Sequence, residues 1–188
     1  MCKKQLSLSS TSPRSDPSLH SLVLLNTGDG KGKSTAAFGV IVRALARGWP
    51  VKVIQFLKSD RWLTGEQQIL ESLGVEWLKG GEGFVRNHSP VSARERALQT
   101  WNVATQELKE GRYRLLVLDE ITLPITLGWL SAGEVAQAVR ERAKEVNVVL
   151  TGRQAPPELI EVADTATEMV KIRHAYDRGI LARAGIDY

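Results

Sequence analysis

A chain of 188 residues with 43% hydrophobic and 24% charged side chains has the size and composition of one globular domain. This composition excludes a wholly disordered chain and a collagen-like repeat, and the single cysteine, Cys2, excludes an internal disulfide framework. The net charge of +4 is small and half of it lies in residues 1–21, so we expect no nucleic acid partner from charge alone.

The chain begins with a serine-rich stretch, residues 1–21, that has no sustained apolar period, and we expect a disordered extension there. A secretory signal and a membrane span are not predicted, because the sequence lacks apolar runs of about 7–15 or about 18 residues in the required places. These features indicate a cytoplasmic protein with no membrane partner. Residues 22–188 are expected to form a single domain.

From residue 22 onward, short apolar runs alternate with longer helical patterns. Strands are predicted over residues 22–25, 51–57, 75–78, 115–118, 146–150 and 169–172. Helices are predicted over residues 33–47, 66–73, 93–109, 133–145 and 156–163, and the glycine-containing residues 79–91 are expected to form a loop. The alternation predicts an α/β fold, with a mostly parallel sheet and helices on both faces. Right-handed crossovers would bring the loops after the strands to one edge, where ligands bind.

The clearest motif follows the first predicted strand and opens the first predicted helix. It reads Thr27-Gly28-Asp29-Gly30-Lys31-Gly32-Lys33-Ser34-Thr35, and its Gly-Lys-Ser end fits a phosphate-binding P-loop, although threonine replaces the usual first glycine. Glycines let backbone N–H groups approach phosphate closely, and a helix N-terminus adds partial positive charge. We expect Lys33 and Lys31 to neutralise phosphate oxygens and Ser34 to face a magnesium ion. Asp29 is expected to point outward or toward that metal.

Two carboxylates, Asp119 and Glu120, end the strand predicted over residues 115–118. In P-loop proteins an acid at this place holds magnesium, directly or through water. Adjacent residues of an extended chain point in opposite directions, so the two carboxylates should have different roles. We expect either Asp119 or Glu120 to reach the metal, and Glu120 could instead orient a nucleophile. Arg153 follows the strand predicted over residues 146–150 and is expected to bind phosphate through forked hydrogen bonds.

These parts leave the reaction open, because kinases, ATPases and other nucleotide-using proteins all combine a P-loop with an acid-ended strand. A conventional ATPase or small-molecule kinase would use Glu120 to activate water or an acceptor hydroxyl, and it would release ADP. A protein that binds ATP without turnover is a further alternative.

Longer blocks of sequence distinguish among these possible reactions. They are the P-loop with Ala36-Ala37-Phe38-Gly39, Val53-Ile54-Gln55-Phe56-Leu57-Lys58, Gly83-Phe84, Val117-Leu118-Asp119-Glu120, Thr151-Gly152-Arg153, Ala163-Asp164, His174-Ala175-Tyr176-Asp177-Arg178-Gly179 and Gly185-Ile186-Asp187-Tyr188. In this order they resemble the P-loop ATP:corrinoid adenosyltransferases, also called cob(I)yrinic acid a,c-diamide or cob(I)alamin adenosyltransferases. The resemblance runs from about residue 22 to residue 188 and implies a P-loop NTPase-like (RecA-like) fold.

The resemblance implies transfer of the 5′-deoxyadenosyl group of ATP to the Co(I) of a reduced corrinoid, with release of tripolyphosphate. It also implies magnesium, a cytoplasmic homodimer, and a flavodoxin-like or other flavoprotein as the reductant of cobalt. ATP would lie reversed in the P-loop, with the γ-phosphate deepest and the ribose C5′ facing the corrinoid. Residues 27–35 and Arg153 would bind ATP, and Lys33, Arg153 and Glu120 would be the catalytic residues. Ser34 and Glu120 would hold the metal, with Asp119 as the alternative.

The corrinoid side of the site rests on Phe84. By resemblance, an aromatic residue at this place walls off the lower face of the corrin ring, and the loss of the lower cobalt ligand eases reduction to Co(I). The family often has tryptophan two residues later, where this chain has Arg86. That departure is the one feature that favours a non-catalytic protein that binds ATP and a corrinoid. His174 lies in a matched block and is interpreted as a structural, hydrogen-bonded histidine.

Overall fold

The computed structural model describes residues 20–57, 64–80 and 90–187. The strands are β1 (Val23–Thr27), β2 (Val51–Phe56), β3 (Glu76–Gly80), β4 (Leu115–Asp119), β5 (Asn147–Thr151) and β6 (Thr165–Glu168). The helices are α1 (Lys33–Leu45), α2 (Gly65–Ser72), α3 (Pro90–Glu110), α4 (Thr122–Thr126), α5 (Ala132–Arg140) and α6 (Pro157–Val162), with a 3-10 helix, η2, at Tyr176–Arg178. In this described part, no helix has the length and apolar character that a membrane crossing requires.

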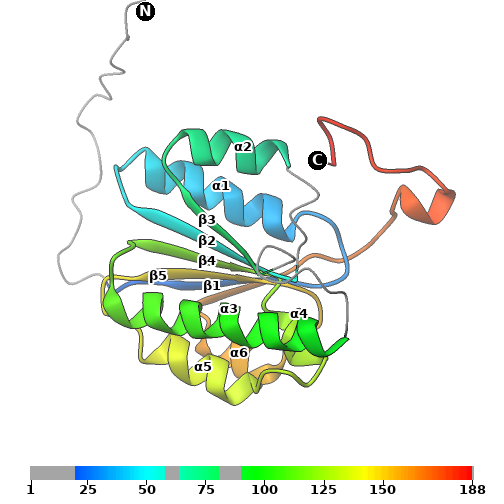
Figure 1. Ribbon diagram of the computed structural model, residues 1–188. Coiled ribbons are helices and arrows are strands. Elements are labelled where there is room, and N and C mark those ends of the chain that lie inside the picture. The colour runs from blue at the N-terminus through cyan, green and yellow to red at the C-terminus, as the bar shows by residue number, and fades with distance from the viewer. Residues whose placement is uncertain (1–19, 58–63, 81–89, 188) are drawn as a thin grey trace, which may run out of the picture.

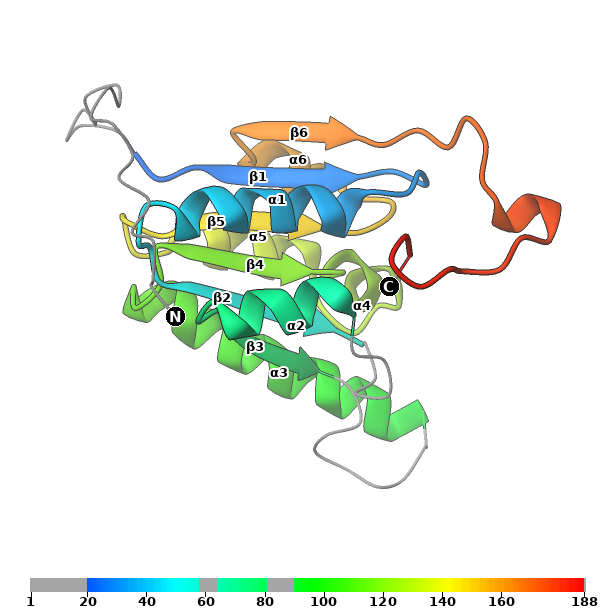
Figure 2. The same ribbon diagram turned by 90° about the horizontal axis from the view of Figure 1, so that it is seen from above.

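The strands form one parallel sheet in the order β3-β2-β4-β5-β1-β6. Helices α1 and α2 cover one face of the sheet, and α3, α5 and α6 cover the other (Figure 1). The predicted α/β fold is therefore confirmed, and the arrangement is consistent with a P-loop NTPase-like architecture. Because all strands run in one direction, their C-terminal ends meet at one edge, which we call the C-terminal edge (Figure 2).

The buried strands explain why the apolar runs were easy to recognise in the sequence. Every residue of β4 is buried, and successive side chains enter different cores. Leu115 and Val117 pack with α1 and α2, while Leu116 and Leu118 pack with the helices of the opposite face. A strand covered on both faces needs apolar side chains at every position, which produces a continuous run instead of an alternating pattern.

The last predicted strand, residues 169–172, is wrong. The sixth strand is β6, which lies at the edge of the sheet and pairs only with β1 among the described strands. All four of its residues are exposed, so its Thr-Ala-Thr-Glu sequence carries no apolar run. The chain then leaves the sheet: the Met169 N–H donates to the carbonyl of Thr27, and the Met169 carbonyl accepts from the Gly30 N–H at 2.6 Å.

Other boundaries also differ from the prediction. The helix predicted over residues 133–145 ends at Arg140, because the Arg142 guanidinium donates to the carbonyls of Val139 and Val146 and thereby closes the last turn. The short helix α4 and the 3-10 helix η2 were not predicted. Of the loop expected over residues 79–91, the first two residues belong to β3 and the last two to α3, while 81–89 lie outside the described residues.

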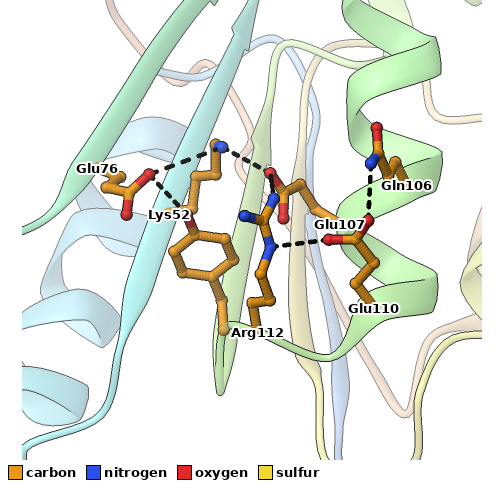
Figure 3. Close-up of polar contacts among 7 residues, drawn as sticks. Lys52, Glu76, Gln106, Glu107, Glu110 and Arg112 are labelled. Atoms are coloured by element: carbon orange, nitrogen blue, oxygen red, sulfur yellow. Dashed lines mark hydrogen bonds and ion pairs between the residues drawn. The ribbon is translucent and has the colours of Figure 1, made fainter.

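The opposite, N-terminal edge of the sheet carries a cluster of charged side chains (Figure 3). The Glu107 carboxylate, whose side chain is 3% exposed, accepts from Lys52 at 2.7 Å and from Arg112 at 2.7 Å. The hydroxyl of Tyr113 donates to Glu76, and the Lys52 ammonium lies 5.2 Å from the centre of the Tyr113 ring. These contacts join β2, β3 and α3 to the residues just before β4, at the edge of the sheet opposite to the loop after β1.

Candidate phosphate-binding site

The loop between β1 and α1 has the backbone shape that the P-loop motif predicts. Gly32 caps α1 with a φ of 114°, a conformation that favours glycine, and no side chain of the described residues caps the first turn of the helix. The first N–H groups of α1 therefore face the C-terminal edge without a capping side chain, and they can meet an anion there.

Lys33 is folded into this loop. Its ammonium group donates to the carbonyls of Gly28 and Gly30, both at 2.7 Å, and the residue is only 6% exposed. Burial lowers the pKa of Lys33, and the nearby Arg153 guanidinium lowers it further. The charged ammonium form of Lys33 is therefore less favoured here than in a lysine that is exposed to water.

A cavity of about 230 Å³ opens at the C-terminal edge beside this loop. Predicted site residues that line it are Gly30, Lys31, Gly32, Lys33, Ser34, Thr35, Glu120 and Arg153. Thr27, Gly28 and Asp29 line a neighbouring cavity of about 310 Å³ instead, together with residues that follow β5 and with β6. Phe84 and Arg86 lie outside the described residues.

Asp119 and Glu120 point in different directions, as their adjacent positions predict. Asp119 is fully buried, and its two carboxylate oxygens accept from the Thr151 hydroxyl at 2.7 Å and from the Gln55 amide at 2.8 Å. The Trp77 indole N–H in turn donates to the Gln55 side-chain oxygen at 2.9 Å. Glu120 lines the cavity, and its backbone adopts a φ of 60° while its N–H donates to Thr151. Glu120 therefore faces the solvent side of the site, and Asp119 braces the strands beneath it.

Two of the cationic side chains at the site form ion pairs with carboxylates. The Arg153 guanidinium lies 3.5 Å from Asp29, and both side chains are exposed. The Lys31 ammonium forms an ion pair with Asp187, which arrives from the far end of the chain. A bound polyphosphate would have to compete with both carboxylates for these cations.

The structure also places residues at the cavity that the site prediction did not include. They are Phe38, Thr64, Glu66, His174 and Asp187. Phe38, His174 and Asp187 had a visible signal, since all three lie in blocks that carry the resemblance. Thr64 and Glu66 had no local pattern that points to an anion site, because the fold brings the start of α2 to the cavity.

Two loop glycines are required by packing as well as by any ligand. A Cβ atom at Gly28 would lie 2.5 Å from the Met169 carbonyl oxygen, and one at Gly30 would lie 2.6 Å from it. Gly28 also has a φ of 96°. The stretch after β6 is thus packed directly on the phosphate loop and fixes its shape.

The oxygen donors at the cavity fit magnesium better than a metal that binds mainly to protein. The described residues hold no group of three His, Cys, Asp or Glu side chains placed for a metal ion. Ser34 and Glu120 supply a hydroxyl and a carboxylate to one cavity. Magnesium is bound in this way by few protein oxygens, with phosphate and water as its other ligands.

Comparison with known proteins agrees with this geometry. The family model described as ATP:corrinoid adenosyltransferase BtuR/CobO/CobP matches residues 20–188. A corrinoid adenosyltransferase of Escherichia coli (strain K12) is 37% identical over 172 residues, which cover 89% of this chain and 85% of that protein. A corrinoid adenosyltransferase of Sinorhizobium sp is 38% identical over 89% of this chain and 80% of its own length. Corrinoid adenosyltransferase CobA of Salmonella typhimurium is 36% identical over 89% of this chain and 85% of its own length.

Proposed function

Because the chain belongs to the ATP:corrinoid adenosyltransferase family, we propose that it transfers the 5′-deoxyadenosyl group of ATP to the Co(I) of a reduced corrinoid. The cobalt electron pair forms the bond to the ribose C5′, and the bond between C5′ and the triphosphate oxygen breaks. Cobalt becomes Co(III), and tripolyphosphate leaves with the electron pair of the broken bond. The observation that carries this proposal is the family match across residues 20–188, joined to a cavity at the phosphate loop that is lined by three cations.

The polyphosphate end of the reaction depends on Lys31, Lys33 and Arg153. Charge develops on the leaving triphosphate, so the task of the protein is to stabilise that charge. Lys33 already lies at the centre of the loop, where it donates to loop carbonyls that a phosphate can replace as acceptors. We assign ATP binding to residues 27–35 with Arg153, and the γ-phosphate to the deepest part of the loop.

The metal would be magnesium, held by Ser34 and Glu120 and by the phosphates themselves. When bound, it supplies a further positive charge to the leaving group. Co(I) is an electron-rich nucleophile, so no residue has to remove a proton from it. Glu120 therefore serves the metal in this proposal, and the remaining work of the site is alignment of cobalt, C5′ and the leaving oxygen.

Further parts of the proposal concern the surroundings of the reaction. A flavodoxin-like or other flavoprotein would reduce the cobalt, Phe84 would wall off the lower face of the corrin ring, and the enzyme would act in the cytoplasm. We also propose a homodimer, which the strongly exposed apolar side chains of Ile172, Leu181 and Ile186 support. Light scattering coupled to size-exclusion chromatography would measure the mass, and a monomer at micromolar concentration would contradict the dimer.

The reaction is tested by mixing the protein anaerobically with Mg-ATP and a chemically reduced Co(I) corrinoid. We expect a light-sensitive adenosylcorrinoid in the visible spectrum and tripolyphosphate as the phosphate product. Lys33→Ala should reduce the rate by about a hundredfold or more. Lys144→Ala, which removes an exposed lysine before β5 at the opposite edge, should leave the rate unchanged.

Two outcomes would contradict the proposal. ADP as the product, formed with another acceptor, would show conventional phosphoryl transfer. Tight corrinoid and ATP binding without a cobalt–carbon product would show a non-catalytic binding protein, and Arg86 would then be the first residue to replace by tryptophan.

A further inference from the structure

The last part of the chain, which we call the C-terminal segment (residues 169–187), returns to the phosphate loop after leaving the sheet. It swings away from the body beyond β6, passes through η2, and comes back toward the C-terminal edge (Figures 1 and 2). Residues 170–187 are all described, and His174 is the one among them that is not exposed. A segment with so little packing of its own is held by the few contacts that it makes with the site.

The His174 ring lies at the cavity and can serve there as a hydrogen-bond donor. Its Nδ1 accepts from the backbone N–H of Tyr176 at 3.2 Å, so the neutral ring carries its proton on Nε2. The side chain lines the same cavity as Lys31, Lys33 and Arg153. An imidazole N–H beside three cations is suited to an anion, and the mechanism proposed above gives this residue no role.

Asp187 brings a negative charge to the same cavity. It pairs with Lys31, and its other carboxylate oxygen accepts from the Arg183 backbone N–H at 2.9 Å. The Lys31 ammonium also lies 3.4 Å from the carbonyl of Ile186. Lys31 holds the pKa of Asp187 below its usual range, and the Arg183 N–H adds to this effect. Near neutral pH the carboxylate is therefore charged, and it pairs with the Lys31 ammonium group to which a phosphate oxygen would otherwise bind.

We propose that the C-terminal segment completes the polyphosphate site, with two residues that act in opposite directions. His174 donates its Nε2–H to the bound polyphosphate. Asp187 holds Lys31 while the site is empty, and the polyphosphate displaces it from that cation. The inference rests on the proposed function, because that reaction is what makes a tripolyphosphate the group to be held at this cavity.

The test is calorimetric titration of the full-length protein with inorganic tripolyphosphate in the presence of magnesium. His174→Ala should weaken binding about tenfold, the effect of a hydrogen bond to a charged group, and His174→Gln should recover part of the loss because it keeps an N–H donor. Asp187→Asn should strengthen binding by up to about fivefold, since an exposed ion pair of this kind is weak. A residue that merely supports the fold would not give changes of opposite sign.

Matched controls lie in the same chain. Asp177→Asn removes the same charge from the same segment, where Asp177 pairs with Lys171 at 3.1 Å, and it should leave the tripolyphosphate affinity unchanged. His20→Ala removes an exposed histidine just before β1, at the opposite edge of the sheet, and should also leave the tripolyphosphate affinity unchanged.

The outcomes separate this inference from the proposed function. If the wild-type protein forms adenosylcorrinoid while Asp187→Asn weakens tripolyphosphate binding, or while His174→Ala leaves it unchanged, only the inference is overturned. If tripolyphosphate binding changes as expected but the wild-type protein releases ADP from ATP, the proposed function fails and the role of the segment in holding polyphosphate stands. Wild-type protein that does not bind tripolyphosphate overturns the inference.

Discussion

The Lys33 ammonium group lies among loop carbonyls and near another cation, and this environment makes its charge sensitive to pH. Burial, and then Arg153, lower its pKa below the ordinary value of 10.5. The neutral form is therefore favoured in the folded protein more than in the unfolded chain. Between the lowered pKa and 10.5 the unfolded chain binds more protons, so this group makes stability rise with pH in that alkaline range.

The effect of the same shift on nucleotide binding has the opposite sign. Phosphate needs a charged Lys33, so we expect the affinity for Mg-ATP to fall as pH rises through the lowered pKa of this residue. Lys33→Arg keeps its charge in that range, so its affinity, though weaker overall, should not show this alkaline decrease. Calorimetric titrations with Mg-ATP at a series of alkaline pH values would measure the affinity of both proteins. An equal decrease of affinity in the wild-type protein and in Lys33→Arg would assign the pH dependence to another group.

Asp119 and Glu120 are adjacent in sequence, yet we expect their amide variants to differ. Glu120→Gln should raise the magnesium concentration for half-maximal Mg-ATP binding about tenfold and leave the free energy of unfolding nearly unchanged. Asp119→Asn should lower the free energy of unfolding by about 1–3 kcal/mol, because an amide cannot accept both the Thr151 and Gln55 hydrogen bonds. Urea unfolding would measure the stability of each variant, and a magnesium titration would measure its metal requirement. If Asp119→Asn changed the magnesium requirement and Glu120→Gln changed the stability, Asp119 would be the metal residue and Glu120 the structural one.

At the scale of elements, backbone contacts with Met169 connect the phosphate loop to the start of the C-terminal segment. Gly30→Ala should push the Met169 backbone away, since its Cβ would lie 2.6 Å from the Met169 carbonyl oxygen. We expect a loss of about 1–3 kcal/mol in the free energy of unfolding, together with weaker tripolyphosphate binding.

A second glycine provides the control for this prediction. Gly39 lies in the middle of α1, where an added Cβ meets no atom of the described residues within 4 Å. Gly39→Ala should therefore stabilise the protein by about 0.5–1 kcal/mol through helix propensity and leave tripolyphosphate binding unchanged. Thermal unfolding would measure the stability of both variants. If Gly30→Ala and Gly39→Ala changed the stability equally, the Met169 contact would not constrain the loop.

The sequence predicts elements best where both faces of the sheet are buried. The apolar runs of β2, β4 and β5 and the P-loop between β1 and α1 were all recognisable from local patterns, because burial dictates residue type there. The edge strand β6 was misplaced because its side chains are exposed and its residues need not be apolar. An exposed strand lacks the run of apolar residues by which a buried strand is recognised, although its backbone forms the same hydrogen bonds.

At the scale of the whole molecule, the contacts of the site that escaped prediction join residues from distant positions in the chain. Lys31 and Asp187 are separated by 156 positions, and no periodicity or spacing relates them. The pairing of Asp119 with Gln55 likewise depends on the register between β4 and β2. Sequence blocks can nominate such residues, but only the fold shows which of them face one cavity.

The parallel sheet also separates the chemistry at one edge from a buried charge cluster at the other. Among the described residues, one carboxylate oxygen of Glu107 has no hydrogen-bond partner, while the other accepts from Lys52 and Arg112. Removal of the Glu107 charge leaves the mostly buried Lys52 ammonium with a longer contact to Glu76, at 3.8 Å. We therefore expect Glu107→Gln to lower the free energy of unfolding by about 3 kcal/mol.

The position of the cluster determines what this loss should leave intact. Glu107 lies near the end of α3, and its partner Lys52 lies near the start of β2, away from the loop that follows β1. At a temperature where the variant is folded, its tripolyphosphate affinity should equal that of the wild-type protein. Glu110→Gln is the matched control, because Glu110 pairs with the same Arg112 at 2.8 Å but is 37% exposed, and its loss should cost at most about 1 kcal/mol. Urea unfolding and calorimetry would measure both quantities, and a coupled loss of affinity in Glu107→Gln would show that the two edges of the sheet do not act independently.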